Sequence, residues 1–207
     1  MDKIICVGKN YVEHAKELGD AIPDKPVLFL KPPSVLHQVS QGGSIELSLP
    51  VGAGSVHHEC EIILRLNRGG FRMSGADAEN AIGWVSLGLD MTLRDRQSVL
   101  KKNGHPWEVS KVFPGSAVTG PWVSVSEFHS WSKENFQFSI DGVLRQQGNV
   151  SQMSLTPAEC ISFASEFFPL CEGDLIFTGT PAGVGPVLSG QKAFLEWGKI
   201  SYSVRWT

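Results

Sequence analysis

HHECEIILRL, residues 57–66, places a cluster of polar side chains directly before an apolar run that is typical of a buried strand. Successive side chains of a strand point to opposite faces, so His57, Glu59 and Glu61 are expected to share one face. Two carboxylates on one face repel each other unless a cation or a proton neutralises them. An isolated Glu-x-Glu is more often a solvated strand end, so the pair alone does not establish a site.

Short β-type runs separated by Gly, Pro and Ser dominate the rest of the chain. In FQFSIDGVLRQQ, residues 136–147, Asp141-Gly142 supplies the positive φ angles of a type I′ turn and predicts a hairpin. The other strands that we predict are Ile4–Val7, Val27–Leu30, Ser44–Leu47, Glu61–Leu66, Ala81–Leu89, Asp174–Phe177, Ala193–Trp197 and Ser201–Trp206.

Two segments carry helix signals. TPAECISFASEFF, residues 156–168, begins with a capping box of Thr156 and Glu159 and has Pro157 at its first helical position. NYVEHAKELG, residues 10–19, presents one apolar face and ends at a glycine. The pattern therefore predicts a mixed, mainly β fold with few helices, and residues 1–207 are expected to form a single domain.

Composition limits the function classes. The net charge of -3 arises from mixed acids and bases, so the chain lacks the basic footprint of a nucleic-acid or membrane-surface protein, and a small-molecule ligand is expected. The four cysteines form no CxxC pair, which favours reduced thiols and a cytoplasmic location. Apolar runs are shorter than the roughly 20 residues that a bilayer requires.

A third carboxylate strengthens the interpretation of the Glu-x-Glu pair. The apolar run AIGWVSLGLD ends at Asp90, which places an acid at the end of a buried strand. Three carboxylates make an all-oxygen site that suits Mg²⁺ or Mn²⁺. Zinc bound by His57, His58 and Cys60 is the alternative, but strand alternation divides these side chains between two faces.

Polar groups that suit an anionic ligand follow Asp90 in the sequence. Arg94 and Gln97 could hold an anion beside a metal, although each is also typical of a solvated helix. In WEVSKVFPGS, strand alternation predicts that Lys111 points inward, where a buried ammonium needs an anionic partner. In DLIFTGTPAGVGP, residues 174–186, backbone amides and the Thr180 hydroxyl could hold a carboxylate, although such a turn is usually only a turn.

These motifs together resemble the fumarylacetoacetate hydrolase family. NYVEHAKE, FLKPP, HHECE, LDMTLRDRQ, KKNGHPWEVSK and IFTGTPAGVG occur in the order and spacing of that family, over essentially the whole chain. The chain is similar in size to the short acylpyruvase and oxaloacetate decarboxylase or tautomerase branch. The resemblance implies a β-roll fold, a homodimer and a divalent ion, Mg²⁺ or Mn²⁺, on the matching Glu59, Glu61 and Asp90.

The resemblance also implies roles for the remaining site residues. Lys111 matches a lysine that supports a developing enolate, and Thr180 matches a threonine that contacts the substrate carboxylate. Arg94 and Gln97 match positions that orient the substrate. His14 and Glu17 match a helical pair that activates water in the hydrolytic members. Lys31 and Asn10 also lie in family-like segments; they could help to shape the pocket, but we favour their interpretation as scaffold.

The expected substrates are 2-oxo acids of the acylpyruvate and oxaloacetate type. The resemblance implies C–C bond hydrolysis, decarboxylation or keto–enol tautomerisation through a common pyruvate enolate held at the metal. A 2-oxopent-4-enoate hydratase or an isomerase of aromatic-compound degradation is the alternative. A binding protein that only sequesters a 2-oxo acid is a third hypothesis, and the water-activating pair argues against it.

Overall fold

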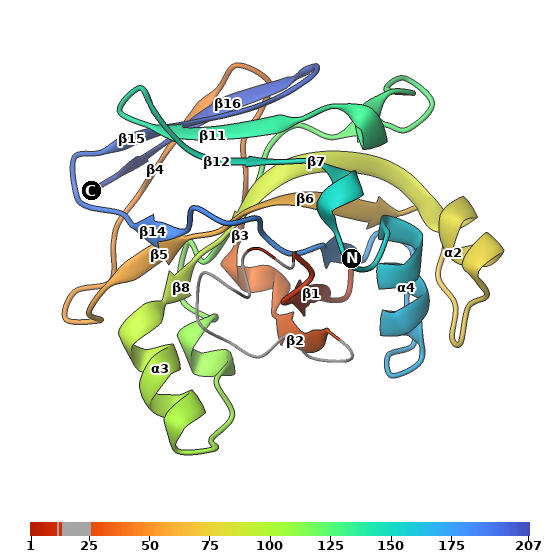
Figure 1. Ribbon diagram of the computed structural model, residues 1–207, viewed down its shortest axis with the longest axis horizontal. Coiled ribbons are helices and arrows are strands. Elements are labelled where there is room, and N and C mark those ends of the chain that lie inside the picture. Colours follow the sequence, from red (N-terminus) through yellow and green to blue (C-terminus); the bar gives the residue numbers. More distant parts are fainter. Residues whose placement is uncertain (12, 14–25) are drawn as a thin grey trace.

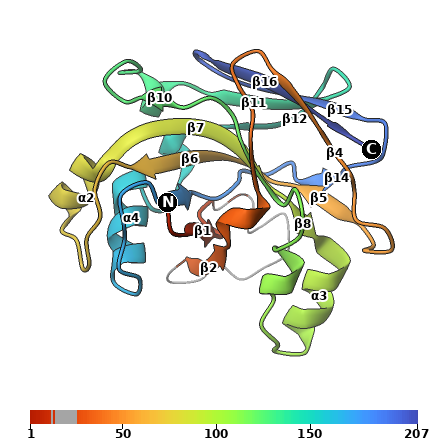
Figure 2. The same ribbon diagram turned by 180° about the vertical axis from the view of Figure 1, so that it is seen from behind.

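The structure is a computed structural model that describes residues 1–11, 13 and 26–207. Within these residues the chain forms three β-sheets and three α-helices (Figure 1). The largest sheet has the strand order β2 (Val27–Lys31), β1 (Ile4–Gly8), β13 (Leu175–Phe177), β6 (Cys60–Leu66), β7 (Ile82–Asp90), β9 (Ala117–Thr119) and β3 (Leu36–Gln38). Strand β10 (Val123–Ser124) pairs with β7 outside this path (Figure 2).

Two smaller sheets complete the β structure. The five-stranded sheet has the order β12 (Val143–Gly148), β11 (Phe136–Ile140), β15 (Lys192–Trp197), β16 (Ile200–Trp206) and β4 (Ser44–Leu47). The third sheet consists of β14 (Gly185–Pro186), β5 (Val56–His58) and β8 (Thr92–Leu93). The chain is therefore mainly β, as the sequence predicts.

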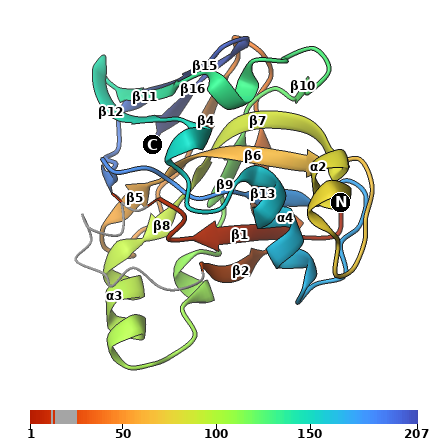
Figure 3. The ribbon, with the colours of Figure 1, turned by 45° about the vertical axis from the view of Figure 1, so that its right-hand side comes forward.

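Strand β13 joins distant parts of the sequence. It pairs in parallel with β1, where Ile4 lies opposite Leu175, and antiparallel with β6, where Phe177 lies opposite Ile63. Figure 3 shows β1 and β13 running beneath β6. The turn that follows β13 is thereby brought to the end of β6 that carries the two glutamates.

The core follows from the alternation of side chains along β6. Ile62 and Leu64 pack into a cluster that includes Phe138 and Leu195 of the five-stranded sheet. Ile63 points the other way, into a second cluster with Phe177. Because both faces of β6 are covered, its apolar run is nearly continuous instead of alternating with polar residues.

The helices lie at opposite ends of the large sheet (Figure 1). Helix α4 (Pro157–Ser165) packs against α2 (Gly75–Ala81), and its predicted capping box of Thr156 and Glu159 is present. Helix α3 (Arg94–Lys102) follows β8 at the other end. The sequence signals missed α2 and α3, because α2 is only seven residues long and Leu93 gives α3 no side-chain cap.

The predicted strands and hairpin are confirmed, with ends shifted by at most one residue. Asp141 and Gly142 have φ angles of 51° and 80°, as a type I′ turn requires. The strand expected around Lys111 is wrong, because residues Glu108–Ser110 form the 3-10 helix η2. The helix predicted over residues 10–19 lies almost entirely outside the described residues. Among those described, no helix has the length and apolar character needed to cross a membrane.

Candidate active site

The three predicted acids meet because of the register between β6 and β7. Cys60 lies opposite Leu89, and the amide of Asp90 donates to the carbonyl oxygen of Glu59 over 2.9 Å. Directly opposed residues of an antiparallel pair share a face, as do residues two apart on one strand. Asp90, Glu59 and Glu61 therefore project to the same side of the sheet.

The acids form a compact buried cluster. Their exposed fractions are 6% for Glu59, 3% for Glu61 and 1% for Asp90. One oxygen from each carboxylate can be chosen so that all three atoms lie within 4.8 Å of one another. Burial, then the charges of Asp90 and Glu59, raise the pKa of Glu61 well above its usual value. The cluster therefore favours a bound cation.

Lys111 lies between two of the acids, as the cap residue that ends η2. Its Nζ donates to Glu59 Oε2 over 2.6 Å and to Asp90 Oδ2 over 2.7 Å. Burial lowers the pKa of Lys111, but the charges of Asp90 and Glu59 outweigh burial and raise it above its usual value. The inward direction predicted for this lysine is confirmed, although a helical turn and not a strand produces it.

Lys31, which the sequence led us to interpret as scaffold, contacts the cluster directly. Its Nζ lies 2.7 Å from Asp90 Oδ1, in an ion pair whose angles fall outside hydrogen-bond geometry. The same ammonium donates to the carbonyl oxygens of Lys111 over 2.6 Å and Ser116 over 2.7 Å. Lys31 therefore connects the Asp90 carboxylate to the backbone segment that carries Lys111.

Arg94 and Gln97 extend the cluster along the first turn of α3. Arg94 Nη2 donates to Glu59 Oε1 over 2.5 Å, and Arg94 Nη1 donates to Gln97 Oε1 over 2.6 Å. Gln97 is buried, which contradicts the solvated-helix alternative for its amide. Arg94 thus fixes the direction of the Glu59 carboxylate.

The turn after β13 closes the other side of the cluster. The amide of Gly179 donates to Glu61 Oε2 over 2.8 Å, and the Thr180 hydroxyl donates to the carbonyl oxygen of Cys60 over 2.8 Å. Gly179 has a φ of 97°, a conformation that a residue with a side chain rarely adopts. The sequence predicted that this turn holds a carboxylate. In the structure that carboxylate is the side chain of Glu61, and the donor is the uncharged backbone amide of Gly179.

The histidines of HHECE lie apart from the acidic cluster. His58 is buried, and its Nδ1 lies 2.9 Å from Gln146 Oε1. Burial lowers the pKa of His58 to about 4, so its ring is neutral near pH 7. The pKa of His57 is also lowered, mainly by burial and in second place by the charge of Arg94. Neither histidine belongs to the group of potential ligands found among the described residues, which argues against the zinc alternative.

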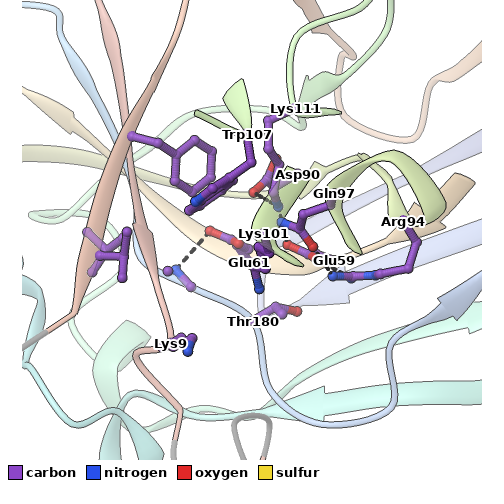
Figure 4. A pocket seen from close by; sticks show the side chains of 15 residues that line it. Lys9, Glu59, Glu61, Asp90, Arg94, Gln97, Lys101, Trp107, Lys111 and Thr180 are labelled. Atoms are coloured by element: carbon purple, nitrogen blue, oxygen red, sulfur yellow. Dashed lines mark hydrogen bonds and ion pairs between the residues drawn. The ribbon is translucent and has the colours of Figure 1, made fainter. Parts of the chain in front are cut away.

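The acids open into a pocket of about 250 Å³ (Figure 4). Glu59, Glu61, Asp90 and Thr180 line it together with Arg94, Gln97 and Lys111. Sequence reasoning did not single out the other lining residues, which include Lys9, Phe29, Lys101 and Trp107. Phe29 lies in FLKPP, and Lys101 and Trp107 lie in KKNGHPWEVSK, but neither motif shows which of its side chains reach the pocket. His14 and Glu17, the predicted water-activating pair, lie outside the described residues.

The residues that are present fit a divalent cation. All three potential ligands are carboxylates, the donor type that Mg²⁺ and Mn²⁺ prefer. The pKa of Glu61 is raised first by burial and then by the charges of Asp90 and Glu59, so a cation beside Glu61 would favour its ionised form. Within the described residues Glu61 is held by a backbone amide and by no ion pair, so its carboxylate charge, when ionised, is available to a metal.

Comparison with known proteins identifies the family. Residues 3–201 match the family model "Fumarylacetoacetate (FAA) hydrolase C-terminal". The chain is 43% identical over 201 residues to the mitochondrial oxaloacetate tautomerase FAHD1 of Oryza sativa subsp. japonica, covering 92% of this chain and 82% of that protein. It is 36% identical over 206 residues to the oxaloacetate tautomerase YcgM of Escherichia coli K12, covering 99% and 92%.

A solved structure has the same fold. The fumarylpyruvate hydrolase of Pseudomonas aeruginosa, in complex with Mn²⁺ and pyruvate, superposes with a TM-score of 0.92 at 35% identity. That alignment covers 100% of this chain and 91% of the hydrolase. The sequence motifs, the β fold and both kinds of relative agree: the chain belongs to the fumarylacetoacetate hydrolase family.

Proposed function

We propose that this chain is a divalent-metal-dependent enzyme that acts on 2-oxo acids of the oxaloacetate and acylpyruvate type, with keto–enol tautomerisation of oxaloacetate as its leading reaction. The observation that carries the proposal is the cluster of Glu59, Glu61 and Asp90, buried on one face of a pocket and in contact with Lys111 and Arg94. The oxaloacetate tautomerases among the relatives support the choice of reaction.

Glu59, Glu61 and Asp90 are proposed to hold Mg²⁺ or Mn²⁺. A divalent ion at such a site supplies Lewis-acid polarisation of a carbonyl oxygen and a template for the neighbouring carboxylate. The protein's own contribution is to hold the three acids in place. Arg94 fixes Glu59, the Gly179 amide fixes Glu61, and Lys31 fixes Asp90.

Lys111 is proposed to stabilise the negative charge that develops on the 2-oxo oxygen when a proton leaves the adjacent carbon. Its ammonium is charged near pH 7, because Asp90 and Glu59 raise its pKa despite burial. A charge fixed in a buried site stabilises a developing oxyanion more strongly than it would in water. The same stabilisation serves tautomerisation, decarboxylation and C–C cleavage, which all pass through an enolate.

Gln97, Arg94 and Thr180 are proposed to bind and orient the substrate carboxylate from the pocket wall. Both terminal nitrogens of Arg94 already donate, one to Glu59 and one to Gln97. Its main effect is therefore to hold the Glu59 carboxylate and the Gln97 amide in position. Thr180 lies on the opposite turn beside Gly179. Substrate binding is thereby shared between α3 and the turn after β13.

C–C bond hydrolysis of acylpyruvates is the second candidate. The fold match to a fumarylpyruvate hydrolase over the whole chain supports it. His14 and Glu17 are proposed to activate the attacking water, because they are three apart in the segment that the sequence predicts to be helical, a spacing at which side chains can hydrogen-bond. Replacing His14 with Ala should then reduce acetylpyruvate hydrolysis more than oxaloacetate tautomerisation. Equal losses would contradict this role.

A substrate panel with Mg²⁺ or Mn²⁺ separates the candidates. We expect conversion of enol oxaloacetate to its keto form to be fastest, ahead of decarboxylation of oxaloacetate and cleavage of acetylpyruvate. Preferential hydration of 2-oxopent-4-enoate would instead support the hydratase alternative. Tight binding of these acids without any turnover would support a binding protein and overturn the proposed enzyme.

Variants then test the assigned residues. We expect Glu61→Gln to abolish Mg²⁺-dependent turnover, and Lys111→Met to lower kcat by about a hundredfold or more, the scale seen when one oxyanion donor is removed. Lys102→Met, at an exposed position on the last turn of α3, is the matched control and should leave turnover unchanged. Full activity in Glu61→Gln would exclude the metal site.

Assembly and location follow from the same family resemblance. We propose that residues 1–207 form one catalytic domain that assembles as a homodimer, which light scattering coupled to size-exclusion chromatography can test. The cytoplasmic location stays a prediction from cysteine usage. It can be tested by fractionating the source cells.

A further inference from the structure

Gln146 has a buried side-chain amide that lies between the start of β6, beside the two glutamates, and the turn after β13. It is on β12 of the five-stranded sheet, opposite Phe138, and only 1% of its surface is exposed. Its neighbour Gln147 points outward and is exposed. Such a buried amide is costly unless its donors and acceptors are paired, so its partners indicate why it is there.

Both ends of the Gln146 amide are fully used. Oε1 accepts from the backbone amide of Cys60 over 3.0 Å and lies 2.9 Å from His58 Nδ1. Nε2 donates to Thr180 Oγ1 over 2.7 Å and to the carbonyl oxygen of Pro181 over 2.9 Å. The Cys60 amide can only donate and the Pro181 carbonyl can only accept, so these two partners fix which end of the amide carries the oxygen.

This orientation determines the direction of the Thr180 hydroxyl. Because Gln146 Nε2 is a donor, Thr180 Oγ1 must accept from it, and its own proton must point elsewhere. That proton now points to the carbonyl oxygen of Cys60, 2.8 Å away. Thr180 also lines the pocket, so a substrate carboxylate is the competing acceptor for the same proton.

Gln146 also anchors the backbone that carries two of the acids. Cys60 lies between Glu59 and Glu61, at the start of β6 and directly after the break that separates it from β5. Its amide is bound by Gln146, while its carbonyl oxygen is bound by Thr180. One side chain thereby connects the glutamate segment to the turn that presents Gly179 and Thr180.

We propose that Gln146 is a positioning residue for 2-oxo acid binding, which keeps the Thr180 hydroxyl proton available to a carboxylate in the pocket. This inference rests on the proposed function. In the bound state the hydroxyl turns from the Cys60 carbonyl to the substrate, while Gln146 continues to donate to Thr180 Oγ1. Removing the Gln146 donor frees the hydroxyl to turn away from the pocket.

A double-mutant cycle tests the inference with a readout that does not require turnover. The dissociation constant of pyruvate is measured by calorimetry in the presence of Mg²⁺ for wild type, Gln146→Met, Thr180→Val and the double variant. We expect Gln146→Met to weaken pyruvate binding about tenfold, the value of one hydrogen bond to a charged group, and to change it less than twofold in the Thr180→Val background. Additive losses would overturn the proposal.

Two further variants separate the role through Thr180 from a general effect on folding. Gln147→Leu, the exposed neighbour, should leave pyruvate binding unchanged. Gln146→Glu keeps an acceptor for the Cys60 amide, and its ionised carboxylate no longer donates to Thr180, so at a pH above the pKa of the new carboxyl group it should weaken binding as much as Gln146→Met. Binding at the wild-type level in the ionised Gln146→Glu variant would show that only the backbone anchor matters and would overturn the role through Thr180.

The wild-type protein provides a measurement that does not depend on whether a variant folds. The side-chain amide resonances of Gln146 should shift when pyruvate is added with Mg²⁺, because the hydrogen bond at Thr180 Oγ1 is rearranged, whereas those of Gln147 should not. Unchanged Gln146 resonances at saturating pyruvate would overturn the inference. Failure of pyruvate to bind at all would overturn the proposed function as well, so the two failures are distinguishable.

Discussion

Lys31 Nζ and Asp90 Oδ1 form an ion pair of 2.7 Å in which neither side chain is more than 2% exposed. The two residues are far apart in sequence and lie at the ends of β2 and β7. Burying two charges costs several kcal/mol each unless they are well paired, so the pair depends on both partners.

Lys31→Met should therefore destabilise the protein by about 3–5 kcal/mol, since it removes one of the two buried cations that contact Asp90 and leaves the carbonyl oxygens of Lys111 and Ser116 without this donor. Urea denaturation measures this loss, and Lys3→Met, which removes a more exposed ammonium, is the comparison. A loss below about 1 kcal/mol would show that Lys111 alone neutralises Asp90.

Divalent ions should stabilise the folded protein. Mg²⁺ at a hundred times its dissociation constant adds about 2.7 kcal/mol if it binds only the folded chain. The melting temperature should rise with Mg²⁺ or Mn²⁺ in wild type and stay constant in Glu59→Gln. An equal rise in both would place the ion elsewhere.

Asp174 should make stability dependent on pH in the acid range. Burial alone raises its pKa, but hydrogen bonds from the Lys3 side chain and from the amides of Asp2, Cys171 and Lys3 lower it below the usual 3.8. A depressed pKa contributes stability that is present above pH 3.8 and is lost as the pH falls through the folded-state pKa.

Asp174→Asn should accordingly lower the free energy of unfolding by about 2–4 kcal/mol at pH 7, because the NH₂ group of the new side chain would face hydrogen-bond donors. The difference in stability from wild type should shrink below pH 3.8. Urea denaturation across this pH range measures the difference. Asp2→Asn, at an exposed carboxylate, is the control. A constant difference at all pH values would contradict the role of the Asp174 charge.

Gly88 should tolerate no side chain. A Cβ at this position of β7 would lie 2.1 Å from the carbonyl oxygen of Val118 and 2.2 Å from Ile63 Cδ1. Gly88→Ala should thus destabilise the protein by about 2 kcal/mol or more, whereas Gly75→Ala, which meets open space in α2, should be neutral or stabilising. Thermal melts of the two variants test this contrast.

The sequence predicted the parts of the fold whose signals are local. Alternation and turn residues located β6, β7 and the hairpin at Asp141-Gly142, and the capping box located α4. Helix α3 escaped prediction because its polar surface and uncapped start carry no local signal. The position of β13 between β1 and β6 is set by long-range pairing, which no local pattern encodes.

In the candidate site, too, local signals were predicted and long-range contacts were not. Strand alternation correctly placed Glu59 and Glu61 on one face, and Asp90 at a buried strand end was recognised as an acid that needs a partner. Lys31 was interpreted as scaffold and Gln146 was not singled out, because each is a polar residue in a strand whose partners come from distant segments. Their importance appears only when burial and hydrogen bonds are known.

The pairing of β13 with β1 and β6 has a consequence for synthesis. Ile4 leaves the ribosome early, yet its partner Leu175 is made near the end, and contacts this distant in sequence slow folding. Gly179 and Thr180 lie in the turn after β13, so the strand that joins β1 to β6 also delivers the last wall of the pocket. The candidate site is consequently complete only after almost all of the chain has been translated.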